Sequence, residues 1–354
     1  MHITPNRETS TRIPRLIRGP VLLCLAMVLF SQGPAAEAQL ASGRSELVLS
    51  LPPGNGPEGI AVSRDGNLFV GNRQIGETAV INEILRIAPD GTAVVFARLP
   101  DSSPDAQGLL GLTVDPRGNL YAALASFDAN HGVWRISRDG KRIERIPGSE
   151  EIGFPNALTF DTRGNFYVTD SFGGAIWCSR RGEPFSLWVA DPLLEPLIDD
   201  PFGFPLPGAN GIAFYPPDNL YVANTERGLI ARVRIERNGS AGPVEAVTAL
   251  FAVPTVDGIA VDVHGQIHAV LPGFSLLGAS PLVSIDPVTG AAAPTVVNPV
   301  DVSRFDTPLS LAFGGGRWDV RTVLVTNGDL PVVPGGPGPG VVQVDVGVPG
   351  FPIP

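Results

Sequence analysis

A phrase of two apolar runs, joined by a turn that contains Gly or Asp, recurs six times along the chain, about once every 50 residues. The copies are PEGIAVSRDGNLFVGN (57–72), LLGLTVDPRGNLYAAL (109–124), PNALTFDTRGNFYVTD (155–170), ANGIAFYPPDNLYVAN (209–224), VDGIAVDVHGQIHAVL (256–271) and the weaker PLSLAFGGGRWDVRTVLVTN (308–327). Each copy predicts a β-hairpin whose second strand is rich in aromatic and β-branched residues. The chain is therefore expected to fold from six equivalent units.

More strands follow each predicted hairpin. A third strand is expected at 83–91, 132–140, 175–182, 229–239, 281–290 and 340–346, and a fourth follows the first five of these, as at 92–100 and 183–191. Four strands per repeat are typical of a propeller blade. The last repeat has no fourth strand of its own, whereas ELVLSLP (46–52) is left over at the other end. The sequence thus predicts an all-β, six-bladed β-propeller with four-stranded blades, closed by an N-terminal strand that completes the last blade. An open solenoid of hairpins is the alternative.

The N-terminal segment has the features of a secretory signal peptide. Four arginines (Arg7, Arg12, Arg15 and Arg18) precede the apolar run 21–30, and the small-residue stretch AEA follows at 36–38. The apolar run is too short to span a bilayer comfortably. Residues 1–38 are therefore expected to be removed, leaving 39–354 as a single propeller domain that is secreted or periplasmic and has no membrane contact.

Charge and cysteine content narrow the choice of partners. The formal net charge of −10 becomes more negative once the four arginines and two glutamates of 1–38 are lost, so nucleic-acid phosphates are repelled. A small-molecule substrate is the expected partner, while the sequence does not indicate an oligomeric state. Cys178 would be the only cysteine of the mature chain, which excludes an internal disulfide.

One residue of each repeat takes the same place, four positions before an aligned apolar residue. Because the first strands of propeller blades line the axis, these six residues are expected to converge there: Glu58, Leu110, Asn156, Asn210, Asp257 and Leu309. Four of the six carry side-chain oxygen, and an oxygen-only set suits Ca²⁺ better than zinc or copper. Two carboxylates at the axis also repel each other without a cation. The alternative is that these polar residues only solvate a water-filled channel.

The repeat phrases, above all FPNALTFDTRGNFYVTDSFGGAIW (154–177), resemble the senescence marker protein / gluconolactonase / luciferin-regenerating enzyme family over essentially the whole mature chain. The order Glu, Asn, Asn, Asp is similar to the catalytic calcium site of diisopropyl fluorophosphatase and the paraoxonases. The resemblance implies that Glu58, Asn156, Asn210 and Asp257 bind one catalytic Ca²⁺; it allows a second, structural ion without indicating its ligands. Gly258 stands where paraoxonases carry a further Asn, so one ligand is absent or replaced by water.

The expected activity is that of a calcium-dependent hydrolase of a lactone or related ester, in which the metal polarises the carbonyl group. Asp257 is the first candidate for nucleophile or base, and Glu58 is an alternative. His131 is a further candidate base, because it lies close to the place of a proposed catalytic His in paraoxonases; simple exposure in a loop is the alternative. The Pro-rich segment 191–210 is expected to cover the face that carries these residues.

Two other functions remain open from the sequence. The chain could be a binding propeller without catalysis, since this architecture also serves as a rigid platform. It could also be a propeller lyase or a strictosidine synthase-like enzyme. Loss of activity on chelation separates the enzymes from the platform, and product analysis separates the two enzymes.

Overall fold

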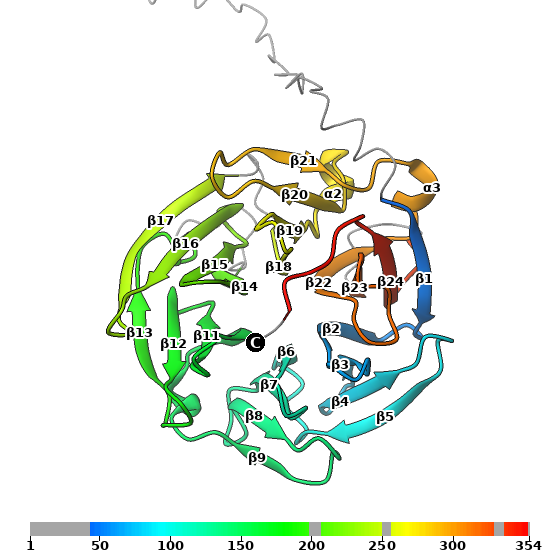
Figure 1. Ribbon diagram of the computed structural model, residues 1–354. Coiled ribbons are helices and arrows are strands. Elements are labelled where there is room, and N and C mark those ends of the chain that lie inside the picture. The colour runs from blue at the N-terminus through cyan, green and yellow to red at the C-terminus, as the bar shows by residue number, and fades with distance from the viewer. Residues whose placement is uncertain (1–42, 198–206, 250–255, 329–335, 353–354) are drawn as a thin grey trace, which may run out of the picture.

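Six four-stranded antiparallel sheets surround a central axis in the computed structural model, which describes residues 43–197, 207–249, 256–328 and 336–352 (Figure 1). In every sheet the strand that begins the sequence repeat lies nearest the axis, and the following strands pair outward from it. The six-bladed β-propeller predicted from the sequence is therefore confirmed, and the open solenoid is excluded.

Five blades are continuous in sequence, and their strands follow from inside to outside. The blades are β2 Asn55–Val62, β3 Leu68–Ile75, β4 Val80–Ile87 and β5 Ala93–Arg98; β6 Gly108–Val114, β7 Leu120–Ala125, β8 Gly132–Ile136 and β9 Ile143–Arg145; β10 Pro155–Phe160, β11 Phe166–Asp170, β12 Ala175–Ser179 and β13 Ser186–Ala190; β14 Ala209–Tyr215, β15 Asn219–Asn224, β16 Leu229–Ile235 and β17 Ala241–Ala249; and β18 Ile259–Val261, β19 Ile267–Val270, β20 Leu282–Ile285 and β21 Ala292–Pro294.

The sixth blade joins the two ends of the described chain. It consists of β22 Thr307–Phe313, β23 Thr322–Gly328, β24 Gly340–Asp345 and, outermost, β1 Ser45–Ser50. β1 runs antiparallel to β24, from the pair Ser45 and Val344 to the pair Ser50 and Gly340. β2 packs against both β22 and β23, so the first blade meets the last. The predicted closure by an N-terminal strand is confirmed.

The turn between the first two strands of a blade is fixed by an aspartate. Asp115 Oδ1 accepts hydrogen bonds from the backbone N–H groups of Arg117 and Asn119, and Asp161 makes the same pair of contacts in the next blade. The Tyr121 and Tyr167 hydroxyls each donate to the second oxygen of the same aspartate at 3.2 Å. The recurring Asp–x–x–Gly–Asn pattern is thus a turn signal that also ties the turn to the second strand.

Little of the described chain is helical. The helices are η1 Ser149–Glu151, α2 Phe274–Leu277 and α3 Pro299–Val302, and none in the described part is long and apolar enough to cross a membrane. Cys178, on β12, is buried and forms no disulfide within that part. Apolar side chains between neighbouring blades, rather than cross-links, hold the ring together.

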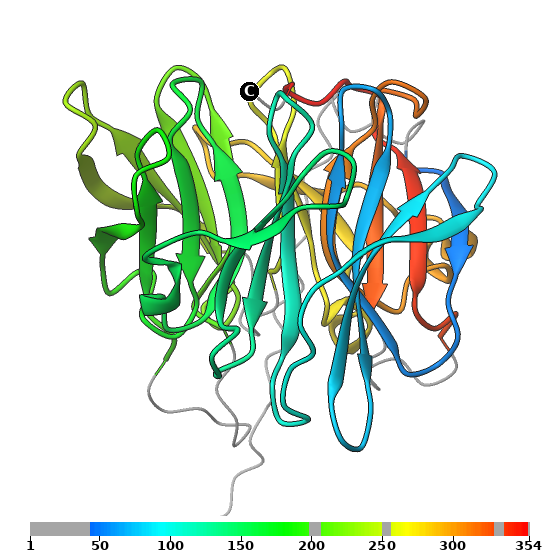
Figure 2. The ribbon, with the colours of Figure 1, turned by 90° about the horizontal axis from the view of Figure 1, so that it is seen from below.

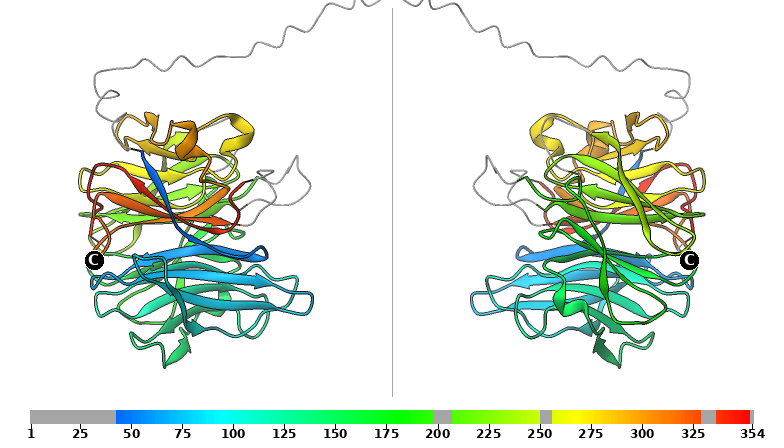
Figure 3. Two further views of the ribbon diagram at one scale, coloured as in Figure 1. Left: turned by 90° about the vertical axis from the view of Figure 1, so that its right-hand side faces the viewer. Right: turned by 90° about the vertical axis from the view of Figure 1, so that its left-hand side faces the viewer.

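The ring has two faces. We call face A the side on which the inner strands begin and face B the side on which they end, at the hairpin turns. After β24, Gly347–Pro352 runs inward across face B to the axis, as the red trace that follows β24 shows (Figures 1, 2 and 3). Of the predicted cover 191–210, residues 198–206 lie outside the described residues, so its role stays a prediction.

Candidate functional site

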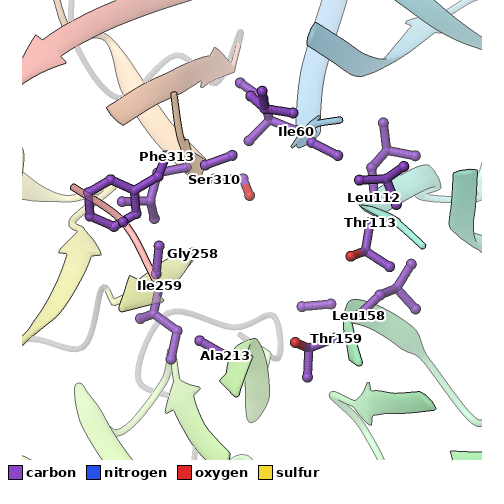
Figure 4. Close-up of a pocket in the computed structure, with 18 of the residues that line it drawn as sticks. Ile60, Leu112, Thr113, Leu158, Thr159, Ala213, Gly258, Ile259, Ser310 and Phe313 are labelled. Carbon is purple, nitrogen blue, oxygen red and sulfur yellow. The ribbon is translucent and has the colours of Figure 1, made fainter. Parts of the chain in front are cut away.

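The predicted site residues lie on the wall of one cavity at the axis. This cavity has a volume of about 520 Å³ and is lined by Glu58, Asn156, Asn210 and Asp257, together with side chains from every blade. Figure 4 shows its walls, with Ile60, Leu112 and Ile259 among the residues around an open centre. The structure therefore brings the four oxygen-bearing residues, from four different blades, to one space.

β-Bulges place three of these four residues, whereas Asp257 lies before β18, which pairs regularly with β19. The regular pairing of β2 with β3 is interrupted between Pro57 and Ile60, so Glu58 lies in the irregular segment. The same interruption includes Asn156 on β10 and Asn210 on β14. A bulge redirects the side chain of a residue that no longer pairs regularly, and bulges are frequent beside active sites. In these three blades the repeat thus turns one residue away from the regular ladder, at face A.

Small residues beside the ring let neighbouring blades approach closely. A Cβ atom on Gly211 would lie 2.3 Å from the Asp257 carbonyl oxygen, and one on Gly258 would lie 2.6 Å from Ser310 Cα. Both neighbours are backbone atoms and cannot rotate away. Gly258 therefore cannot carry the additional Asn that paraoxonases have here unless β22 moves, which gives the departure from that pattern a physical cause.

Hydroxyl groups bind the backbone carbonyls and the side-chain amides of the candidate ligands. Thr326 Oγ1 donates to the Glu58 carbonyl at 2.7 Å, and Thr169 Oγ1 donates to the Asn210 carbonyl at 2.8 Å. Each of these hydrogen bonds joins two adjacent blades. Asn210 Nδ2 donates to Thr225 Oγ1 at 2.9 Å.

The amide of Asn156 is held in the same way. Its Nδ2 donates to Ser171 Oγ at 3.0 Å, and Ser171 follows β11 as Thr225 follows β15. Because both amides use their NH₂ groups in these contacts, their carbonyl oxygens Oδ1 are the atoms left to bind a ligand. Within the described residues neither Oδ1 accepts a hydrogen bond.

The two carboxylates strain each other electrostatically. Burial raises the pKa of Glu58, and the neighbouring Arg73 offsets part of that effect. Burial also raises the pKa of Asp257 well above its usual value, the charge of Glu58 raises it further, and Arg73 and Asn210 act in the opposite direction. Glu58 and Asp257 are thus close enough to repel each other, in an environment that favours an added positive charge.

Arg73 is the site residue that sequence reasoning missed. It lies on β3 opposite Gly56, and its Nη1 is 2.9 Å from Glu58 Oε2 and donates to the Gln107 carbonyl at 3.1 Å. Its side chain is only 10% exposed, and its Nε has no hydrogen-bond partner within the described part of the protein. The available signal was an arginine directly after the repeat phrase 57–72, because no other repeat has a cation at that place.

The donor set fits a hard divalent cation. Two carboxylates and two amide oxygens, without His or Cys, are the ligands that Ca²⁺ prefers, and a shell of about six to eight leaves places for water or substrate. Arg73 neutralises one carboxylate, so net attraction for a cation is lower than the ligands alone indicate. Elsewhere in the described ranges no three His, Cys, Asp or Glu side chains come together, so the second structural ion stays a prediction.

His131 lies apart from the cavity wall. The residue is 8% exposed and is not among those that line the cavity. Its Nδ1 accepts from the Phe127 N–H at 3.1 Å, and Nε2, which then carries the proton, donates to the Ile152 carbonyl at 2.7 Å. Both nitrogens are therefore occupied by backbone groups. The structure brings Glu58, Asn156, Asn210 and Asp257 together but does not bring His131 to them.

These features define a six-bladed propeller with an oxygen-rich axial cavity, and comparisons with known structures agree with that class. A gluconolactonase from Xanthomonas campestris superimposes with a TM-score of 0.59 at 17% sequence identity, over 90% of this chain and 94% of that one. Regucalcin from Agrobacterium tumefaciens, a calcium-binding protein, matches with a TM-score of 0.59 at 16% identity, over 87% and 94%. A luciferin-regenerating enzyme matches with a TM-score of 0.60 at 15% identity, over 87% and 97%.

Sequence comparisons extend over less of the chain. Residues 46–74 match the family model described as strictosidine synthase-like, N-terminal, a stretch that includes Glu58 and Arg73. No curated protein sequence matches the chain. The structural neighbours are thus the propellers of the resemblance noted in the sequence, which is confirmed at the level of the fold.

Proposed function

We propose that the protein is a metal-dependent hydrolase of lactones or related esters, with Ca²⁺ as the expected ion. The observation that carries this proposal is the convergence of Glu58, Asn156, Asn210 and Asp257 on one axial cavity, where the pKa values of both carboxyl groups are raised. The gluconolactonase among the structural neighbours supports this class of activity, and the calcium-binding regucalcin supports the choice of ion. A purely structural platform has no need of two repelling acids at its axis.

Each residue has a task that follows from its position. Asn156 and Asn210, held through their NH₂ groups, present Oδ1 as neutral ligands, and Glu58 adds a charged ligand oriented by Arg73. The bound cation would act as a Lewis acid that polarises the substrate carbonyl. Asp257 is less enclosed than Glu58 and, within the described residues, forms no ion pair, so it is the carboxylate available to attack the carbonyl carbon or to take a proton from water.

The activity test is a panel of lactones, aryl esters and phosphotriesters, assayed with Ca²⁺ and after chelation. We expect lactone or ester hydrolysis that requires the cation, and we expect Asp257→Asn to abolish it. Asp105→Asn is the matched control, because Asp105 is an exposed carboxylate just before β6 on face A. Equal turnover by Asp257→Asn and the wild type would refute the mechanism.

Cation binding is measured separately from turnover. A ligand present at 100 times its dissociation constant stabilises the folded state by about 2.7 kcal/mol, so titrated Ca²⁺ should raise the melting temperature of the wild type. The rise should shrink in Glu58→Gln and persist in Asp105→Asn. Stabilisation without turnover on any substrate would instead favour a binding propeller.

A synthase or lyase related to strictosidine synthase is the second candidate, favoured by the family match over residues 46–74. The two candidates differ in their products: a hydrolase incorporates one water molecule per turnover, whereas a lyase releases an unsaturated product and a synthase forms a new bond. Mass spectrometry of the products in H₂¹⁸O separates them.

We also propose that the protein is exported, to the periplasm or the medium. The basic segment, apolar run and AEA stretch within 1–38 support this, although they lie outside the described residues. Sequencing the N-terminus of the purified native protein should give Gln39 as the first residue, and an intact Met1 in the exported fraction would contradict the assignment.

A further inference from the structure

A cluster of aromatic rings lies on face A between the second and third blades. Phe127 follows β7, whose last residue Ala125 pairs with Gly108 at the start of the inner strand β6. Phe172 follows β11, whose last residue Asp170 pairs with Pro155 at the start of β10, and Phe154 directly precedes that strand. The registers therefore place all three phenylalanines at the end of the ring that carries Glu58, Asn156, Asn210 and Asp257.

The cluster has buried and exposed members. Phe154 and His131 are 5% and 8% exposed, whereas Phe127 and Phe172 are 52% and 45% exposed. The ring centroid of Phe127 is 5.4 Å from that of His131 and 6.4 Å from that of Phe172, and the Phe127 and Phe172 planes differ by only 5°. The ring centroids of Phe172 and Phe154 are 4.4 Å apart. We call the two exposed rings, Phe127 and Phe172, the aromatic shelf.

Phe127 is held in a conformation that a phenylalanine rarely adopts. Its φ of 57° lies in the left-handed region, which is costly for a residue with a bulky side chain. His131 maintains this conformation by accepting from the Phe127 N–H while its other nitrogen binds the Ile152 carbonyl. A glycine at position 127 would remove this backbone strain. The protein therefore carries an exposed aromatic ring here at a cost in conformational energy.

The shelf adjoins residues that support the candidate site. Phe154 packs in one cluster with Leu110, which takes in the second blade the place that Glu58 takes in the first. Phe154 also lies two positions before Asn156. Ser171, which binds the Asn156 amide, directly precedes Phe172. These rings are not part of the cavity wall itself. A substituent that extends outward from the axis over the second and third blades on face A would therefore reach them.

We propose that Phe127 and Phe172 are specificity-determining residues that bind an aromatic or long apolar substituent of the substrate, and that His131 is the positioning residue of this shelf. The inference rests on the proposed hydrolase function and narrows its substrate class. Lactones and esters with an aryl or alkyl substituent are preferred over polyhydroxylated lactones, because flat apolar rings gain contact with such groups and offer no hydrogen bonds to hydroxyls.

Kinetics with two substrates test the shelf. For an aryl or long-chain lactone, Phe127→Gly and Phe172→Ala should each raise KM by roughly tenfold with little change in kcat, since only binding common to ground and transition states is lost. For a polyhydroxylated lactone both constants should stay at wild-type values, and Phe127→Tyr should retain affinity for the aryl substrate. Equal effects on the two substrates would overturn the proposal.

Controls separate a specific role from a structural one. Phe127→Gly should be at least as stable as Phe127→Ala, reversing the usual order, because glycine accepts the positive φ. Val288→Gly truncates another exposed apolar residue, 90% exposed in the turn between β20 and β21, and should leave both substrates unaffected. His131→Ala should raise KM for the aryl substrate alone; a fall in kcat for both substrates would instead identify His131 as a catalytic base and contradict its positioning role.

A measurement of direct ligand binding tests the aromatic shelf separately from the proposed hydrolase activity. Titration of the wild type with 2-naphthol, followed by its fluorescence, should show saturable binding that weakens in the Phe127→Gly, Phe172→Ala double variant. Binding of this kind without any hydrolysis would refute the proposed function but not the apolar site, whereas hydrolysis without such binding would refute the shelf alone. A wild-type dimer that the double variant converts to a monomer in sedimentation velocity would assign the rings to a second copy and overturn the proposal.

Discussion

Arg73 decides how much net charge the axial site offers to a cation. When both carboxyl groups are ionised, the formal charges of Glu58, Asp257 and Arg73 leave one net negative charge, and the guanidinium already binds one oxygen of Glu58. Arg73 thus acts as a built-in counter-ion for a buried acid, which would otherwise be costly to fold around. It also keeps a divalent ion from gaining the full attraction of both carboxylates.

Replacing Arg73 should therefore make the protein dependent on its cation. In Arg73→Met we expect the metal-free form to lose about 3–5 kcal/mol of stability, because Glu58 keeps its burial and loses its partner. Ca²⁺ should then bind about tenfold more tightly, since a nearby positive charge is gone. Calorimetric titration and melting curves with and without Ca²⁺ measure both effects; Arg73→Lys keeps the charge and is the control. Weaker Ca²⁺ binding by Arg73→Met would mean that orienting Glu58 outweighs charge.

His268 shows how a side chain of different chemistry can serve the same turn. In the fifth blade Asp262 accepts from the His264 and Gln266 N–H groups, and His268 Nε2 lies 3.1 Å from Asp262 Oδ2, where blades two and three use a tyrosine. Burial acts to raise the pKa of Asp262, but the contacts with His268 and the two backbone N–H groups outweigh it and hold the pKa below its usual value.

The lowered pKa of Asp262 gives this contact a definite pH dependence. Its contribution to stability is complete above the usual carboxyl pKa of about 4 and is lost as pH falls through the lower folded-state value. Asp262→Asn should therefore be less stable than the wild type at pH 7, and the gap in urea unfolding should close as the solution is acidified. His268→Tyr should reproduce the arrangement of blades two and three, whereas His268→Phe should cost about 1–3 kcal/mol. An unchanged gap at low pH would contradict the role of this carboxylate.

Among the elements, the hairpins were predictable and the bulges were not. The hairpins carry local turn signals, such as the aspartates that cap Asp–x–x–Gly–Asn turns, and alternation of apolar residues fixed their strands. A bulge such as the one at Glu58 and Gly59 requires no particular residue type, so the sequence contains no signal for it. The alignment of the repeats therefore indicated which residues are equivalent but not how their side chains are turned inward. The Arg73–Glu58 pair was missed for the same reason, because it depends on how the bulge displaces Glu58 relative to β3.

The closing strand β1 is tied down by one aspartate at its start. Asp301, in α3, accepts from the Ser45 N–H at 2.8 Å, and the Ser45 hydroxyl donates to the Asp301 carbonyl at 3.0 Å. Asp301→Ala leaves the buried Ser45 N–H without its partner and should cost about 1–3 kcal/mol. Urea unfolding and hydrogen exchange of β1 measure the loss; Asp301→Asn keeps an acceptor and should be milder. Equal stability of Asp301→Ala and the wild type would show that the β1–β24 ladder alone closes the ring.

At the scale of the whole molecule, the tail after β24 makes the two ends of the axial cavity unequal. The Phe351 N–H donates to the Val261 carbonyl at 2.9 Å, and the Val263 N–H donates to the Pro349 carbonyl at 3.1 Å. Phe351 packs edge-on against Tyr215, and Pro349–Pro352 form part of the cavity wall at face B. The candidate ligands lie at the other end, so the tail narrows the cavity opposite the proposed reaction site.

Removing the tail should therefore affect stability and access while leaving the cation site intact. Truncation before Gly347 loses the two backbone hydrogen bonds and the Phe351 contact, which should lower stability by about 1–3 kcal/mol and speed hydrogen exchange at the Val263 N–H. Gly350→Ala should act in the same direction, since a Cβ there would lie 2.1 Å from Phe313 Cγ. Ca²⁺ affinity should be unchanged in both variants, because Glu58, Asn156, Asn210 and Asp257 lie at face A. A truncated protein that keeps its melting temperature but loses Ca²⁺ binding would show instead that the tail supports the metal site through the inner strands.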